Sequence, residues 1–301
     1  MPRLREHLKP LLRTVFRVAS EDVPCPTLLE HERLGFYQRV DQGTQVLLRL
    51  KYQEMVRRKE PLPIFDDVQF RSFSQNGEDG ILLYIFSLVG TTNKRVVEIC
   101  AGDGVECNAA NLIINHGWRG LLFDGDEGNI SRGRAFYARH KDTWISPPQL
   151  VQAWITRDNI DRLISEHGFA GEIDLLSLDI DGNDYWVWEA IECARPRVVV
   201  VEHNSFAGPE VSATIPYRED FVADVSQSPP YLGATLPAFV KLARRKGYRL
   251  VGGERLGFNA FFVRDGLGEV VLPEVEAAAV AGVAASAAGL EMLRTREFVE
   301  V

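Results

Sequence analysis

Two stretches of the sequence end in groups of oxygen-bearing side chains. Asp179 and Asp181 follow one apolar run, and Glu202, His203 and Asn204 follow the next β-branched run. Carboxylates this close repel one another, so they are tolerated only beside a cation, beside basic groups or with a raised pKa. Several oxygen ligands from two loops suit Mg²⁺ or Ca²⁺ rather than zinc. The pattern therefore predicts an Mg²⁺ site made by Asp179, Asp181, Glu202 and Asn204.

A metal-free interpretation of the same segment stays open. Asp181, Gly182 and Asn183 can form an Asx-type turn, and Asp184 can cap the helix that follows.

Three side chains in this region are candidates for catalysis. His203 is the first candidate for a general base, because an unperturbed imidazole titrates near neutral pH. Asp179 and Tyr185 are the other two. A lone histidine in a loop is often incidental, and only its place beside a strand-end carboxylate favours a role in proton transfer.

Upstream, a strand pattern ends in Glu98 and enters a loop of small residues, Ala101, Gly102 and Gly104. A backbone without side chains lets a ligand lie against the strand tip, and the N-terminus of the next helix supplies N–H groups. Cys100 stands where such loops place their first glycine. A tight strand-to-helix turn also needs glycines for structural reasons, so the loop alone is a weak indication.

The next strand pattern ends in Asp124. A carboxylate at the tip of a second strand can accept hydrogen bonds from both ribose hydroxyls of an adenosyl group. Asp126 is the substitute if that strand ends later. Thr156, after the third predicted strand, belongs to a segment that can flank the adenine ring.

These residues depend on a regular series of elements. Short β-branched runs alternate with helical patterns between residues 68 and 272, which predicts βα units and a mostly parallel sheet. The predicted strands are 95–99, 120–123, 151–155, 173–179, 198–202, 248–251 and 260–263, and the predicted helices are about 78–89, 107–116, 128–140, 158–167, 184–193 and 234–246. The last two strands are joined through glycines without a helix, which predicts an antiparallel hairpin at the sheet edge. A dinucleotide-binding domain would end in a sixth parallel strand instead.

The element order is that of the α/β, doubly wound, seven-stranded (Rossmann-like) methyltransferase sheet with a C-terminal antiparallel hairpin. Four motifs together resemble the FkbM-type members of the class I S-adenosylmethionine-dependent methyltransferases. They are Ser74-Gln75-x-Gly77-Glu78-Asp79, the Glu98 loop, Trp118-Arg119-Gly120 and Asp179-Ile180-Asp181-Gly182. The resemblance covers about residues 70–265, and Cys100 departs from it.

The resemblance implies S-adenosyl-L-methionine as methyl donor, with Gln75 near its amino-acid end. The expected donor-binding residues are Gln75, Glu98, Ala101, Gly102, Gly104, Asp124 and Thr156. The expected acceptor is a hydroxyl group on a small molecule or glycan. In position, the acidic residues are also similar to those of catechol, caffeoyl-coenzyme A and macrocin-type O-methyltransferases, where a divalent ion anchors the acceptor.

Two other hypotheses compete with this one. The altered glycine loop is consistent with a non-catalytic module that keeps the fold for binding or assembly. An NAD-dependent or hydrolytic metalloenzyme on the same sheet is disfavoured by the terminal hairpin and by the missing second mononucleotide-binding half.

Composition sets the remaining expectations. The chain has 301 residues and a net charge of -8, which argues against a nucleic-acid-binding surface over the whole molecule. Its four cysteines have no metal or disulfide spacing, so we expect a cytoplasmic protein. No apolar run is long enough for a transmembrane helix.

Two extensions are predicted to flank the central domain. Residues 1–67 form an N-terminal helical extension, with a basic amphipathic segment first and a helix capped at Thr27 and interrupted at Gly35 and Gly43. This extension is suited to homo-oligomer contacts or to a lid over the site. Residues 273–301 form an alanine-rich helical tail.

Overall fold

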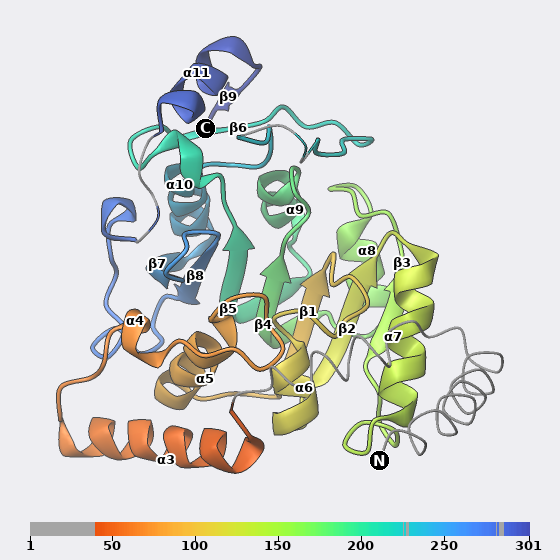
Figure 1. Ribbon diagram of the computed structural model, residues 1–301, viewed down its shortest axis with the longest axis vertical. Helices are drawn as coiled ribbons and strands as arrows, with labels where there is room; N and C mark the ends of the chain where they lie inside the picture. The colour runs from red at the N-terminus through yellow and green to blue at the C-terminus, as the bar shows by residue number, and fades with distance from the viewer. Residues whose placement is uncertain (1–39, 225, 227–228, 281, 283–285) are drawn as a thin grey trace, which may run out of the picture.

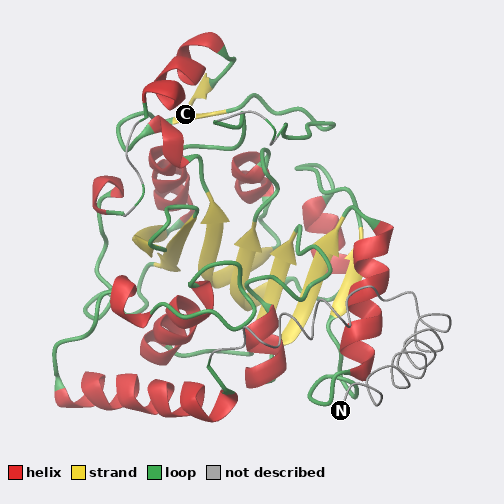
Figure 2. Ribbon diagram, viewed as in Figure 1, coloured by secondary structure: helices red, strands yellow, loops and turns green. Residues whose placement is uncertain are grey.

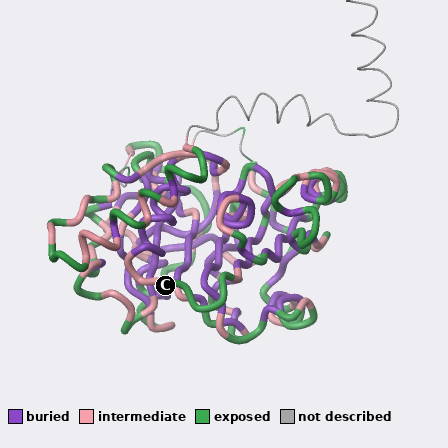
Figure 3. The backbone as a smooth tube through the Cα atoms, turned by 90° about the horizontal axis from the view of Figure 1, so that it is seen from below, coloured by how far each residue is buried: buried purple, intermediate pink, exposed green. Residues whose placement is uncertain are grey.

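The computed structural model describes residues 40–301, apart from 225, 227–228, 281 and 283–285. The predicted amphipathic segment, the helix start at Thr27 and the interruption at Gly35 lie outside the described residues. In the described part, helices cover both faces of one central sheet (Figures 1 and 2). The backbone buried most deeply runs through the middle of the molecule, and exposed segments surround it (Figure 3).

The central sheet has seven strands in the order β3-β2-β1-β4-β5-β8-β7. The strands are β1 (Arg95–Ile99), β2 (Arg119–Asp124), β3 (Gln149–Gln152), β4 (Gly171–Leu178), β5 (Ala194–Glu202), β7 (Tyr248–Gly253) and β8 (Asn259–Arg264). The first five are parallel, and β8 lies antiparallel between β5 and β7. The predicted fold class and the terminal hairpin are therefore confirmed. Because β1 pairs with both β2 and β4, the chain reverses its direction of travel across the sheet there, which is where open α/β sheets bind ligands.

Alternate residues of the parallel strands serve two separate cores. Val97 and Ile99 of β1 face one core with α8 (Ile160–Glu166), α9 (Asp184–Ala190) and α10 (Leu236–Lys246). Val96 faces the other core, with α5 (Glu78–Val89), α6 (Ala110–His116) and α7 (Glu127–Arg139). The strands read as continuous apolar runs in the sequence because both of their faces are covered.

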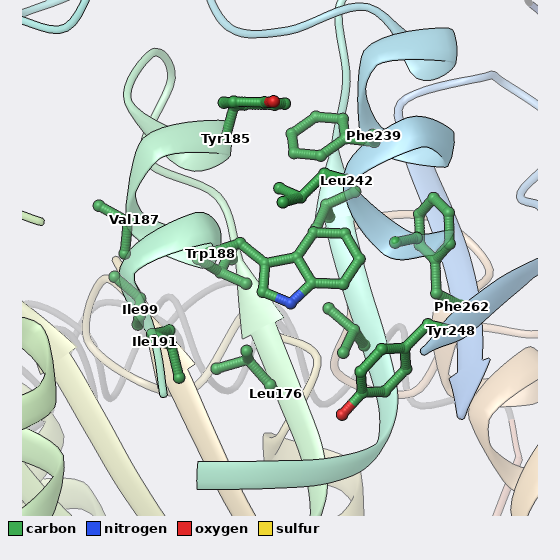
Figure 4. Packing of buried hydrophobic residues seen from close by; sticks show 14 of the residues in the cluster. Ile99, Leu176, Tyr185, Val187, Trp188, Ile191, Phe239, Leu242, Tyr248 and Phe262 are labelled. Atoms are coloured by element: carbon green, nitrogen blue, oxygen red, sulfur yellow. The ribbon is translucent and has the colours of Figure 1, made fainter. Parts of the chain in front are cut away.

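Trp188 on α9 is at the centre of the first core (Figure 4). Its ring centroid lies 5.3 Å from that of Phe262, 6.0 Å from that of Tyr248 and 6.1 Å from that of Phe239. The packing joins α9, α10, β7 and β8, so it locks the terminal hairpin onto the parallel part of the sheet.

The N-terminal extension differs from the prediction at Gly43. Helix α3 (Gln42–Arg58) starts after Asp41, whose side chain accepts a hydrogen bond from the Thr44 amide at 3.1 Å. Gly43 therefore lies in the first turn of an unbroken helix, and the predicted interruption there was wrong. A short helix, α4 (Phe65–Val68), leads from α3 towards α5.

Helix α3 is tied to α6 by a polar contact. The Nε2 atom of His116 lies 2.7 Å from the side-chain oxygen of Gln45, which is fully buried. Burial lowers the pKa of His116 to about 4, and the nearby charges of Arg49 and Lys94 act in the same direction. His116 is therefore neutral in the folded protein at neutral pH.

The predicted third strand and the tail also differ from the structure. The strand β3 ends at Gln152 rather than continuing to residue 155. The tail is no continuous helix: a single 3-10 turn, η2 (Ala277–Ala279), and the helix α11 (Ala287–Thr295) are separated by Gly282, whose φ of +77° takes the backbone out of the helical region. After α11, the two-residue strand β9 (Val299–Glu300) pairs with β6 (Ala213–Thr214). Within the described residues, no helix is both long and apolar enough to cross a membrane.

We predict that Trp188→Ala lowers the free energy of unfolding by about 3–5 kcal/mol, because it empties a fully buried aromatic site. Chemical denaturation followed by circular dichroism measures the change. Trp144→Ala is the matched control, since Trp144 is 61% exposed, and should change stability by less than about 0.5 kcal/mol. Equal effects of the two substitutions would contradict the assignment of the core.

A second prediction concerns acid. The folded-state pKa of His116 lies below its unfolded value of 6.5, so its contribution to stability is present above pH 6.5 and is lost as the pH falls towards 4. In denaturation midpoints measured between pH 7 and 4, His116→Gln should lose less stability than the wild type over that interval. Parallel pH profiles of the wild type and His116→Gln would show that folding does not lower the pKa of His116.

Candidate active site

The carboxyl ends of β1, β2, β4 and β5 meet at one edge of the sheet, uppermost in Figure 1. Asp179, Asp181 and Glu202 come together there, each with one carboxylate oxygen within 4.8 Å of the others. Asp181 is exposed and the other two are half-buried. The structure thus brings together three of the four predicted metal ligands.

The carboxylates of this group affect one another's protonation. Burial raises the pKa of Asp179 and that of Glu202, and in both cases repulsion from neighbouring carboxylates adds to the effect. Two carboxylates in contact cannot both ionise easily, so the pair retains a proton unless a cation compensates its charge.

Other carboxylates at this edge stabilise loops by accepting hydrogen bonds from backbone amides. One oxygen of Asp79 accepts hydrogen bonds from the amides of Ser72, Phe73 and Ser74 at 2.7–2.8 Å. This fixes the turn that contains Gln75, whose exposed side chain projects from it. Gln75 is thus held by its backbone and its side chain is left available.

Glu98 and Asp184 are used in the same way. Glu98 accepts hydrogen bonds from the Asn108 amide at 2.9 Å and from the Ala109 amide at 2.6 Å, which folds the loop after β1. Asp184 accepts hydrogen bonds from the Ile180 and Gly182 amides at 2.7 and 2.9 Å. The structure therefore uses Glu98 to support the glycine loop from within.

Asp179, Asp181 and Glu202 differ from these loop-holding carboxylates. Among the described residues, none of the three accepts a hydrogen bond from a backbone amide or from a basic side chain. Apart from the hydrogen bond between Asp179 and Glu202, their oxygens keep acceptor capacity that a ligand could use.

The glycine loop after β1 has the geometry of a ligand-facing turn. Cys100, Gly102 and Gly104 all have positive φ, at 61°, 57° and 72°. A side chain at Gly104 would approach Leu122 to 2.8 Å, whereas one at Gly102 would meet no atom within 4 Å. The two glycines thus have different roles. Gly104 allows the loop to pack closely on Leu122, and Gly102 leaves open space above the loop.

Asp124 joins this loop to the next strand. It is the last residue of β2, and its Oδ2 accepts a hydrogen bond from the Gly102 amide at 2.9 Å. Its Oδ1 accepts from the Asp126 amide at 2.9 Å and from the Asn129 side chain at 3.0 Å. Asp126 instead caps α7. Because β2 ends at Asp124, the condition for choosing Asp126 is not met.

The surroundings of Cys100 show how negative this edge is. The residue is exposed at the surface, yet burial of its thiol and the carboxylates of Asp184, Asp124 and Asp179 raise the pKa of the thiol far above its usual value. Desolvation and charge repulsion both oppose the thiolate. A cation would find a favourable potential at the same place.

His203 is buried and both of its ring nitrogens lack a hydrogen-bond partner among the described residues. Burial lowers its pKa to about 4, so the imidazole is neutral at physiological pH. Asn204 is committed to its own loop, because its oxygen accepts from the Phe206 amide at 3.2 Å and its amide donates to the Leu232 carbonyl at 3.0 Å.

Tyr185 lies in the hydrophobic core. Its ring is directed towards Phe239 (Figure 4), and its hydroxyl accepts a hydrogen bond from Arg245 at 2.7 Å. The structure does not bring Tyr185 together with the acidic group. Helix periodicity explains this placement, since α9 turns Tyr185 and Trp188 towards the same core.

Several buried polar atoms at this edge have no partner. Among the described residues, buried side-chain atoms without a hydrogen bond belong to Asp79, Asn183, His203, Thr214, Tyr217 and Asn259, and to Arg197 elsewhere. Asn259 pairs in register with Glu202, and the others come from the segments around the same strand ends. Buried polar groups in folded proteins are nearly always satisfied, so this concentration indicates a site for a polar ligand.

Trp154 and Thr156 follow β3. Trp154 is 54% exposed, and a side chain at Gly125 would lie 3.4 Å from its ring, so the indole rests against the turn after Asp124. Thr156 is buried, and its amide donates to the Asn159 side chain at 2.9 Å. Trp154 belongs to the segment expected to flank the adenine, although Thr156 alone was singled out there; the structure shows that the exposed side chain of the two is the indole.

A long segment after β5 closes over this edge. Three side chains hold its backbone: Trp154 donates to the Glu219 carbonyl at 2.7 Å, Asn183 to Arg218 at 2.8 Å and Trp186 to Ile215 at 2.9 Å. The amide of Val301 donates to the Ser212 carbonyl at 3.2 Å. The segment is thus fastened from both sides.

We predict that Cys100 reacts with N-ethylmaleimide at pH 7.5 at least about tenfold more slowly in the folded protein than in urea, because the neighbouring carboxylates disfavour the thiolate. Mass spectrometry of the Cys100 peptide measures the rate. Equal rates in the two states would mean that the carboxylates do not act on the thiol.

No protein-family model matches the sequence, and no curated protein matches it. Solved structures do resemble the fold. The N-terminal domain of EvdMO1 with S-adenosylhomocysteine bound is 12% identical, with 71% of this chain and 94% of that chain covered and a TM-score of 0.42. The glycopeptide N-methyltransferase MtfA is 12% identical, with 58% and 83% covered and a TM-score of 0.37. The CcbJ methyltransferase from Streptomyces caelestis is 16% identical, with 58% and 84% covered and a TM-score of 0.38. At these values the strand order remains the evidence for the fold.

Proposed function

We propose that this chain is an S-adenosyl-L-methionine-dependent methyltransferase. The observation that carries the proposal is the group of carboxylates beside the glycine loop: Asp124 accepts a hydrogen bond from the Gly102 amide at 2.9 Å, and Asp179, Asp181 and Glu202 lie together at the same edge. A loop with this environment would repel the pyrophosphate of a dinucleotide and favours the sulfonium cation of the methyl donor.

The donor's parts have matching positions along the edge. We assign Asp124 to the ribose: its Oδ1 already has two donors, whereas its Oδ2 accepts only from the Gly102 amide and can accept from a ribose hydroxyl. The exposed Trp154 ring offers a flat surface for the adenine beside the turn after Asp124. Ala101, Gly102 and Gly104 form the loop whose backbone the donor can approach closely. Thr156 follows Trp154 by two residues and is assigned to the same end of the donor. The exposed Gln75 is assigned to the donor's amino-acid end.

For the acceptor, we propose a hydroxyl group on a small molecule or glycan. Asp179, Asp181 and Glu202 would hold Mg²⁺, because they are the carboxylates that no backbone amide occupies; Asn204 is left out since both ends of its amide are engaged. A bound Mg²⁺ would lower the pKa of a coordinated hydroxyl. His203 is then the proposed base. Because its own pKa is about 4, it is suited only to a hydroxyl whose pKa the metal has already lowered.

The test of the donor is calorimetric titration with S-adenosylhomocysteine. We expect micromolar binding by the wild type and at least about tenfold weaker binding by Asp124→Ala, which loses charge-assisted hydrogen bonds to the ribose. Asp142→Asn is the control, because Asp142 is an exposed carboxylate away from this edge and should bind as the wild type does. Absence of binding by the folded wild type would favour a non-catalytic module, in which Cys100 disables the loop.

The metal has a separate test. Asp181→Asn should weaken Mg²⁺ binding by at least about tenfold while leaving the affinity for S-adenosylhomocysteine within about twofold, since Asp181 is assigned to the ion and not to the donor. Calorimetry with each ligand alone gives both numbers. Unchanged Mg²⁺ affinity would remove the ion from the mechanism and leave the methyltransferase proposal standing.

A further inference from the structure

A cavity of about 340 Å³ lies at the edge of the sheet opposite the acidic group. It is bounded by α3, α5, the end of α6 and the turn before β1, at the lower left of the sheet in Figure 1. Its apolar lining includes Leu83, Phe86, Leu112 and Trp118, and its polar lining includes Arg49, Gln53, Ser87, Thr91, Lys94 and His116. The volume is within the range of small-molecule sites.

Arg49 is the unusual residue of this cavity. It is half-buried, and it makes no hydrogen bond or ion pair with any residue that the structure describes. The other buried or half-buried arginines of the described chain all donate hydrogen bonds; they are Arg71, Arg95, Arg132, Arg197, Arg249 and Arg264. A partly desolvated guanidinium without an acceptor is costly, so an anion is the missing partner.

The rest of the lining agrees with an anion. Lys94 also lines the cavity and donates only to the carbonyl of His116, at 3.1 Å, which leaves further donor capacity. Asp174, a buried carboxylate bonded to the turn before β1, is engaged by the amides of Thr92 and Asn93 and by Arg197. Among the described residues no carboxylate lines the cavity, so the charge of this lining is positive.

The apolar side of the cavity indicates which kind of anion it would bind. Trp118 is buried and packs edge-to-face on Phe86, with ring centroids 4.7 Å apart. Leu83 and Leu112 complete an apolar surface beneath the two cations. These four side chains are buried and predominantly apolar, so this side of the cavity suits an anion with an apolar body better than a bare phosphate.

We propose that this cavity binds a small organic carboxylate with an aromatic body, its carboxylate paired with Arg49 and Lys94 and its ring set against Trp118 and Phe86. The site lies at the edge remote from Asp124 and the acidic group. It is independent of the methyltransferase proposal.

The probe is 3-phenylpropanoate, titrated into the full-length protein while the indole N–H signals are followed by NMR. The chain has five tryptophans, so each edge has its own reporter: Trp118 for this cavity and Trp154 for the donor site. Spectra of Trp118→Phe and Trp154→Phe identify the two signals. We expect a saturable shift of the Trp118 signal with a dissociation constant of about 1 mM or tighter, as suits a fragment-sized ligand, and no shift of Trp154.

Two matched controls isolate the charge. Arg49→Gln should weaken binding at least about tenfold, whereas Arg57→Gln, on an exposed position of the same helix, should leave it unchanged. The neutral analogue 3-phenylpropanamide should bind at least about tenfold more weakly than the acid. Absence of a Trp118 shift, or equal affinities for acid and amide, would overturn the proposal. S-adenosylhomocysteine, added separately, should shift Trp154, so failure of one site is distinguishable from failure of the other.

Discussion

The structure depends on one electrostatic constraint: carboxylates buried at the ends of strands must receive hydrogen bonds, and backbone amides supply them. Asp79, Glu98 and Asp184 each draw two or three loop amides onto their oxygens. Asp174 does the same at the opposite edge with the amides of Thr92, Asn93 and Lys94. The loops around the sheet are therefore folded about anions, and their shapes persist only while those carboxyl groups stay buried and bonded.

The same constraint distinguishes carboxylates that stabilise loops from carboxylates that can bind a ligand. A carboxylate that organises a loop uses part of its acceptor capacity on backbone amides, and one that does not keeps that capacity for a ligand. Asp179, Asp181 and Glu202 belong to the second kind, and the repulsion among them is energy that a bound cation would recover. Arg49 is the corresponding cation: it is half-buried, and the described chain provides no acceptor for its hydrogen bonds, so it is left available for an anion.

The sequence predicted the fold because strand-length apolar runs and glycine-linked terminal strands have few alternative arrangements. It also placed Asp124, Asp179 and Glu202 at one edge, since parallel strands end on the same side. It could not show that Glu98 would turn to its own loop, or that Tyr185 would point into the core, because these depend on hydrogen-bond competition and helix rotation. Asn259 was missed because its partnership with Glu202 arises from the register of an antiparallel pair, which no local pattern encodes. Gly43 misled because a glycine in the first turn of a capped helix costs little.

Helix α5 connects the two edges of the sheet in a single stiff element. Its first turn carries Glu78 and Asp79, which hold the loops at the acidic edge, and its last turns carry Leu83 and Phe86, which line the cavity at the other. Its 12 residues span about 18 Å without a proline or an internal glycine beyond Gly80. Ten of its residues, Glu78 to Ser87, are buried against the surrounding elements. The helix therefore joins, through one continuous backbone, two places that share no side chain.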